Sequence, residues 1–157
     1  IEENLALAYT RKASPSFFAL NKKDSAYFRE VLSTLGMGLE DRMKTKIGLL
    51  SGGQRQAASL LMATIAEPEL LLLDEHTAAL DPGAAEKVMA LTKKIVEENK
   101  ITTLMITHDM EYALEYGSRT IMLDSGKIVM DLTGKEREEM TTGKLAELFY
   151  GKAHKRG

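Results

Sequence analysis

The chain has 157 residues, 44% of them hydrophobic and 28% charged, and its 23 acidic and 21 basic side chains give a formal net charge of −2. This composition is typical of a globular protein with a substantial core, and the near balance of charge predicts no nucleic-acid partner. There are no cysteines, which excludes disulfides, thiolate metal sites and cysteine nucleophiles. No apolar run approaches the length of a membrane-spanning helix.

The first fifty residues have the pattern of helices. Apolar residues recur at helical spacing over 2–9 and over 24–35, and each stretch predicts a helix. Breaker residues between them predict a loop over 11–23. Phe17 and Phe18 in that loop are expected to fold back onto the nearest core, although they could also contact a partner protein.

From residue 51 onward, helices alternate with short apolar strands. Ser51 is the expected N-cap of an apolar helix that ends at Glu67-Pro68. The continuous apolar run Leu70 to Leu73 predicts a strand that is covered on both faces. Asp81-Pro82 then begins an amphipathic helix, because aspartate is a good N-cap and proline is favoured at the first helical position.

The rest of the chain continues this alternation. Strands are expected over 102–107, 120–123 and 127–130, and helices over 110–116 and 142–149. Asp124-Ser125-Gly126 predicts a turn between the last two strands. Alternating strands and helices predict an α/β fold with a mostly parallel sheet and helices on both faces.

Two carboxylates, Asp74 and Glu75, directly follow the four leucines. In open parallel sheets, ligands bind outside the carboxyl ends of the strands. One of these acids could hold a magnesium ion while the other orients a water molecule for attack. A strand that simply ends in two solvated acids is the alternative, and Asp74 and Glu75 alone do not decide between the two.

Two further sites have both a functional and a structural interpretation. Ser51, Gly52 and Gly53 place backbone N–H groups at a helix N-terminus, which favours phosphate binding, but a capped helix after a glycine turn has the same sequence. His108, at the end of a predicted strand, could donate a hydrogen bond to a phosphate oxygen or merely cap the helix that follows.

Taken together, these segments form an ordered series. Leu50-Ser51-Gly52-Gly53-Gln54-Arg55-Gln56, the apolar run ending in Asp74-Glu75, Ala79-Leu80-Asp81-Pro82 and His108 resemble the C-terminal portion of ATP-binding cassette (ABC) ATPases. The resemblance covers nearly the whole chain. It implies a partial P-loop NTPase (RecA-like) core with a mostly parallel sheet. Residues 1–50 would be part of a helical subdomain leading to the signature loop, and 51–157 the C-terminal part of the ATPase core with the Walker B, D-loop and H-loop segments and the terminal strands and helix.

The resemblance also implies a role for each matching residue. The signature loop would face an ATP held by a partner subunit, in trans, and would consist of Ser51, Gly52, Gly53 and Gln54. On the chain's own side, Asp74 would be the magnesium-associated carboxylate, acting through water, and Glu75 the general base. Asp81 would be the D-loop aspartate and His108 the histidine that contacts the γ-phosphate.

Two positions depart from the family's usual pattern. His76 stands where the family commonly has proline, and Ala78 stands where it commonly has serine. The turn after Glu75 therefore lacks a φ restraint and a hydroxyl group, and we expect a change in local stability or rate.

The phosphate loop G-x-x-x-x-G-K-[ST] is absent from the sequence. Four Gly-Lys pairs occur, beginning at Gly126, Gly134, Gly143 and Gly151, and none is followed by serine or threonine. Together with a first residue other than methionine, this predicts an N-terminally truncated piece of a longer protein. Alone, the piece is expected to be inactive, and a slot in its sheet would leave backbone groups unpaired.

The predicted function is that of the ATP-binding and ATP-hydrolysing subunit of an ABC membrane transporter. The expected cofactors are ATP and Mg²⁺. The expected partners are a second ATPase subunit and transmembrane permease subunits, with a cytoplasmic location on the inner face of the cell membrane. A non-transport ABC ATPase is an alternative, which the short stretch before Ser51 and the lack of cysteine disfavour. A non-hydrolytic nucleotide-dependent module is another, which Glu75 disfavours. Cargo and direction of transport stay open.

Overall fold

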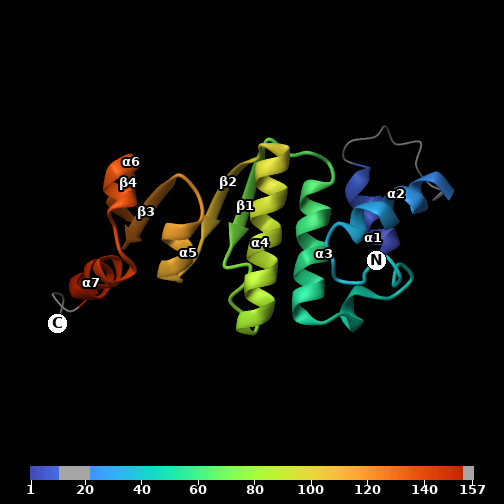
Figure 1. Ribbon diagram of the computed structural model, residues 1–157, viewed down its shortest axis with the longest axis horizontal. Helices are drawn as coiled ribbons and strands as arrows, with labels where there is room; N and C mark the ends of the chain where they lie inside the picture. Colours follow the sequence, from blue (N-terminus) through green and yellow to red (C-terminus); the bar gives the residue numbers. More distant parts are fainter. Residues whose placement is uncertain (11–21, 154–157) are drawn as a thin grey trace. The chain divides into compact units, whose positions relative to one another are not determined.

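The computed structural model describes residues 1–10 and 22–153. Most of the predicted loop, including Phe17 and Phe18, lies outside these residues. The chain divides into two compact units, Ile1–Met105 and Ile106–Gly157, which are taken separately below. The first unit contains α1 (Glu2–Tyr9), α2 (Lys22–Ser33), the 3-10 helix η1 (Ile47–Leu49), α3 (Gly52–Thr64), β1 (Leu70–Asp74) and α4 (Pro82–Asn99), and β2 (Thr102–Ile106) ends at its boundary (Figure 1).

The core of the first unit lies among its helices and the inner face of β1. Phe28, Leu32 and Leu39 are fully buried, and α1 packs against both α2 and α3. The predicted helix over 2–9 is confirmed as α1, and the helix predicted over 24–35 begins and ends two residues earlier as α2.

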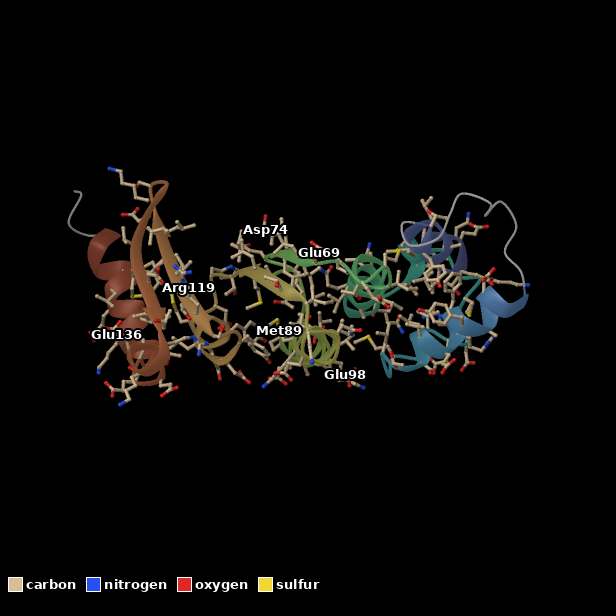
Figure 2. All side chains as sticks on the ribbon, turned by 90° about the horizontal axis from the view of Figure 1, so that it is seen from above. Glu69, Asp74, Met89, Glu98, Arg119 and Glu136 are labelled. Carbon is tan, nitrogen blue, oxygen red and sulfur yellow. The ribbon has the colours of Figure 1, made fainter. Side chains whose placement is uncertain are left out.

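Helix α4 covers one face of the two-stranded sheet formed by β1 and β2 (Figures 1 and 2). Val88 and Leu91 of α4 are buried, whereas Lys87 and Lys94 are exposed, as the amphipathic pattern predicts. Leu71 and Leu73 of β1 point into the core with 5% and 8% of their surface exposed.

The prediction that β1 is covered on both faces is wrong. Its burial alternates, and Leu70 and Leu72 are 54% and 65% exposed. Leu104, on the outer face of β2, is also 54% exposed. The physical reason is that helices of the described residues pack on only one face of this sheet. The continuous apolar run therefore forms a strand with one buried and one exposed face.

The second unit contains α5 (Met110–Glu115), β3 (Arg119–Asp124), β4 (Lys127–Thr133), α6 (Gly134–Glu138) and α7 (Thr142–Ala153). Strands β3 and β4 pair antiparallel, with Asp124 opposite Lys127 across a two-residue loop. Ser125 and Gly126 both have positive φ, at 51° and 74°, which is the backbone of a tight hairpin turn. Arg137 of α6 donates hydrogen bonds to the Leu114 and Tyr116 carbonyls and so fixes α6 to the end of α5.

The predicted mostly parallel sheet is therefore found only in part. In the described residues the strands form two separate two-stranded sheets, β1 with β2 and β3 with β4, and the second is antiparallel. A hairpin loop of two residues forces the antiparallel arrangement, because parallel strands need a long crossover. The α/β class is confirmed, and the division into segments 1–50 and 51–157 stays a prediction about the complete ATPase domain.

Candidate functional site: the start of helix α3 and the end of strand β1

The serine of the glycine-rich segment caps helix α3 through a reciprocal pair of hydrogen bonds. The Ser51 hydroxyl oxygen accepts from the Gln54 backbone N–H at 3.3 Å, and the Gln54 side-chain oxygen accepts from the Ser51 N–H at 3.3 Å. This capping box satisfies two backbone donors that a helix start would otherwise leave unpaired. The predicted N-cap is confirmed, and the hydroxyl proton of Ser51 is not used by the cap because the oxygen acts as acceptor.

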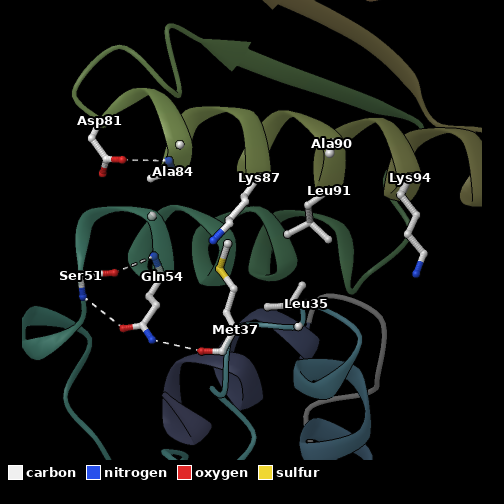
Figure 3. A pocket seen from close by; sticks show the side chains of 13 residues that line it. Leu35, Met37, Ser51, Gln54, Asp81, Ala84, Lys87, Ala90, Leu91 and Lys94 are labelled. Atoms are coloured by element: carbon white, nitrogen blue, oxygen red, sulfur yellow. Dashed lines mark hydrogen bonds between the residues drawn. The ribbon is translucent and has the colours of Figure 1, made fainter.

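The Gln54 side chain has further partners within the chain. Its amide oxygen also accepts from the Arg42 guanidinium at 3.2 Å. Its amide nitrogen donates to the Met37 carbonyl at 3.1 Å (Figure 3). One side chain thus joins the helix start to two points of the preceding segment. The sequence pattern assigned Gln54 to nucleotide contact, and it missed this positioning role because Met37 and Arg42 belong to no motif.

The two glycines lie where helix α3 approaches the first turn of α4 and the segment before it. A Cβ added at Gly52 would meet the Leu80 side chain at 3.0 Å, and one added at Gly53 would meet the Ala84 Cβ at 3.2 Å. Helices α3 and α4 lie side by side and pack against each other (Figure 1). The absence of a side chain at Gly53 is therefore required for packing, whereas at Gly52 only the flexible end of Leu80 would have to move.

Helix α4 begins beside this contact. Asp81 is its N-cap, the Asp81 carboxylate accepts from the Ala84 N–H at 3.0 Å, and Pro82 occupies the first turn. The starts of α3 and α4 line one open groove of about 800 Å³, together with Lys87 and Lys94 (Figure 3). The start of α3 and two ammonium groups give the groove a positive potential that favours an anionic ligand, and the Asp81 carboxylate at the start of α4 offsets part of it.

The predicted carboxylates stand at the carboxyl end of β1. Asp74 is the last residue of the strand and Glu75 the first of the turn, and both are exposed. Glu75 has φ 43°, in the left-handed region that non-glycine residues rarely adopt. The Glu75 carbonyl accepts from the Ala78 N–H at 3.0 Å, so the turn that holds Glu75 is closed by a backbone hydrogen bond.

A magnesium site fits these residues only as part of a larger ligand set. Among the described residues, no group of three histidine, cysteine or acidic side chains could hold a metal ion. Mg²⁺ is commonly bound by one or two carboxylates together with substrate phosphates and water. Asp74 can supply one such carboxylate, and the remaining ligands would come from the nucleotide and solvent.

His76, which no motif assigned to a function, occupies the middle of the same turn. Its Nε2 lies 3.2 Å from the Thr92 hydroxyl oxygen in α4. Burial removes solvent from the imidazole and lowers the pKa of His76 below its usual 6.5. The departure from proline at this position was visible in the sequence, but its partner sixteen residues away was not.

His108 belongs to the second unit and is exposed just after β2. The structural alternative, in which His108 caps the following helix, is wrong. Asp109 is the N-cap of α5, and the Asp109 carboxylate accepts from the Glu111 and Tyr112 N–H groups at 2.9 and 3.0 Å. The role of His108 at a γ-phosphate stays a prediction.

Comparison with known proteins identifies the family. The family model described as ABC transporter matches residues 1–78. The tyrosine transport ATP-binding protein of Clostridioides difficile is 42% identical over 149 residues, which are 95% of this chain and 59% of that protein. This chain is part of an ABC transporter ATP-binding domain. The methionine import ATP-binding protein MetN of Clostridium tetani is 39% identical over 68% of the chain and 34% of its own length.

Solved ABC structures have the same fold. An inward-facing ABC transporter of metal-chelate type superposes with a TM-score of 0.75 at 24% identity, over 95% of this chain and 57% of that one. A dimeric ATP-binding cassette bound to ADP and Pi superposes with a TM-score of 0.66 at 32% identity, over 84% and 55% of the two chains. The ABC chain described here thus spans little more than half of the C. difficile relative and of either solved chain.

Members of this ABC family bind and hydrolyse ATP. Within the described residues, no helix is both long and apolar enough to cross a membrane.

Proposed function

We propose that this chain is the C-terminal portion of the ATP-hydrolysing subunit of an ABC importer. The observation that carries the proposal is the joint geometry of the first unit. The capped start of α3 and the Asp81 cap of α4 line one positively charged groove, and Asp74 and Glu75 follow β1 in the same unit. Similarity to tyrosine, methionine and phosphonate transport proteins favours import of small polar solutes.

Each residue of the groove can perform a defined task. The Ser51 hydroxyl, whose proton the cap leaves available, would donate to a phosphate oxygen of a nucleotide held by a second ATPase subunit. The backbone N–H groups at the start of α3 would add positive potential at the same point. Gln54 would hold the loop in shape, because its side chain already bonds to Arg42 and Met37.

The carboxylates at the end of β1 would act on the chain's own side. Bound Mg²⁺ would neutralise charge on the transferred phosphoryl group. Asp74 would hold the ion through water, and Glu75 would orient the attacking water and accept its proton. His108 would donate a hydrogen bond to a γ-phosphate oxygen, and Asp81 would order the segment between Glu75 and α4. A mostly parallel RecA-like sheet would be completed by the part of the ATPase domain that carries the phosphate loop.

The proposed partners follow from this division of labour. A signature loop that serves a nucleotide in trans requires a second ATPase subunit, and transport requires permease subunits in the membrane. The subunit would then lie on the cytoplasmic face of the membrane through contacts with the permease. The dimeric cassette and the transporter complex among the structural neighbours are consistent with both partners.

The proposal is tested with the complete subunit assembled with its permease in lipid vesicles. Glu75→Gln should lower the ATP hydrolysis rate by roughly 100-fold or more, because it removes the general base. Ser51→Ala should lower the rate while leaving the affinity for a fluorescent ATP analogue nearly unchanged. Ser59→Ala, a serine further along the same helix, is the matched control and should hydrolyse ATP normally.

Any of three results would overturn this assignment. Full ATP hydrolysis by Glu75→Gln would remove Glu75 from the chemistry. A severe loss of ATP affinity in Ser51→Ala would show that the loop serves the chain's own nucleotide. A complete subunit that co-purified only with ribosomes or DNA would point to the non-transport alternative. Purified residues 1–157 are expected to show no ATP turnover.

A further inference from the structure

The turn between β1 and α4 is short, and its backbone conformation is fixed at both ends. It begins with the left-handed backbone of Glu75 and ends at the Asp81 cap. Two backbone hydrogen bonds close it, from the Ala78 N–H to the Glu75 carbonyl and from the Leu80 N–H to the Thr77 carbonyl. A left-handed backbone is strained at a non-glycine residue, so this conformation persists only where surrounding contacts hold it.

His76 supplies such a contact from inside the turn. Its Nε2 lies 3.2 Å from the hydroxyl oxygen of Thr92, which is 5% exposed. The Thr92 hydroxyl already donates its one hydrogen to the Val88 carbonyl at 2.8 Å. The imidazole must therefore be the donor, and His76 carries its proton on Nε2. The hydrogen bond joins the turn to a buried position in the middle of α4.

We propose that His76 is a positioning residue for Glu75, whose Nε2–H bond to Thr92 holds the turn in the conformation that presents the Glu75 carboxylate. This rests on the proposed role of Glu75 in ATP hydrolysis. Because Glu75 and His76 are adjacent, the imidazole constrains the backbone on the C-terminal side of Glu75 while β1 constrains the other side. Loss of the hydrogen bond removes one of the contacts that support the left-handed conformation of Glu75.

The kinetic test uses the complete subunit with its permease. His76→Ala and Thr92→Val each remove one partner of the hydrogen bond. Each should lower kcat for ATP by about 10–100-fold with little change in KM. The reason is that a displacement of a catalytic group by about 1 Å can lower the rate about 100-fold. His76→Gln, which keeps a donor at a similar distance from the backbone, should recover most of kcat. The double variant should be no slower than the slower single variant, because both substitutions break the same bond.

Thr64→Val is the matched control. Thr64 is also a buried threonine, and its hydroxyl donates to carbonyls three and four residues earlier in its own helix, α3. Its kcat per folded molecule should equal that of the wild type. Wild-type kcat in His76→Ala, or equal effects of Thr92→Val and Thr64→Val, would refute the positioning role. If Glu75→Gln itself retained full activity, the proposed function would fall instead.

A spectroscopic measurement on the unmodified subunit gives an answer independent of activity. The imidazole Nε2–H of His76 should appear in ¹⁵N-resolved proton spectra as a solvent-protected signal, assigned by its loss in His76→Gln. It should vanish in Thr92→Val and persist in Thr92→Ser and Thr64→Val. Rapid solvent exchange of this proton in the wild type, or its persistence in Thr92→Val, would show that the hydrogen bond does not hold the turn.

Discussion

The contact between Gly53 and helix α4 predicts a steric effect that can be separated from any effect on nucleotides. In Gly53→Ala the new Cβ would lie 3.2 Å from the Ala84 Cβ and 4.0 Å from its Cα. A methyl group attached directly to the α4 backbone cannot rotate away, so α3 and α4 must separate by a few tenths of an ångström. Overpacking of this kind typically costs about 1–3 kcal/mol.

The higher helix propensity of alanine opposes this steric cost. Alanine favours a helix over glycine by up to about 1 kcal/mol, so the net destabilisation of Gly53→Ala should be about 1 kcal/mol. Gly52→Ala provides the comparison, because its new Cβ would meet only the terminal Cδ2 of the half-exposed Leu80 at 3.0 Å. Leu80 can change rotamer, and Gly52→Ala should be neutral or stabilising by about 0.4–1 kcal/mol.

The assay is urea unfolding of the complete subunit, followed by circular dichroism, in two backgrounds. Ala84→Gly removes the methyl group that Gly53→Ala would contact. If the clash is real, the cost of Gly53→Ala should fall by about 1 kcal/mol or more in the Ala84→Gly background, a non-additivity expected of side chains in contact. Equal costs of Gly53→Ala in both backgrounds would refute the steric reasoning, and so would a Gly52→Ala variant less stable than Gly53→Ala.

Three further predictions concern the hydrogen bonds around the site, each measured as a change in the urea midpoint. Arg42→Ala should destabilise the subunit by about 0.5–1.5 kcal/mol through loss of the half-buried bond to Gln54, whereas Arg29→Ala, which breaks an exposed ion pair, should cost little. Asp81→Ala should cost about 1 kcal/mol and Asp81→Asn much less, since asparagine also caps helices. Burial lowers the pKa of His76 in the folded state, so the unfolded chain binds this proton more readily. The stability of the folded state should therefore be retained above pH 6.5 and should fall as the pH falls below it. His76→Gln should remove this pH dependence.

Local features of the fold could be predicted from sequence, because their causes lie within a few residues. The Ser51 and Asp81 caps, the Pro82 start of α4 and the Ser125-Gly126 turn are confirmed. Each rests on a side chain and a backbone group separated by at most three positions, or on a backbone conformation that glycine tolerates.

Features that depend on distant partners could not be predicted. The four leucines of β1 do not reveal how many layers cover the strand, and only alternate ones are buried. The Gln54 side chain meets Met37 seventeen residues away, and His76 meets Thr92 sixteen residues away. For the catalytic and nucleotide-binding roles, sequence resemblance supplies the assignments, and Asp74, Glu75, Asp81 and His108 keep them as predictions.

The three-point attachment of the Gln54 side chain has a consequence for how this protein family can vary in length. Met37, Arg42 and Ser51 must all remain within reach of one amide group. An insertion or deletion between Met37 and Ser51 would have to return the chain to the same points, or else release the start of α3. Natural length changes should therefore be rarer within this interval than in surface loops that carry no such attachment.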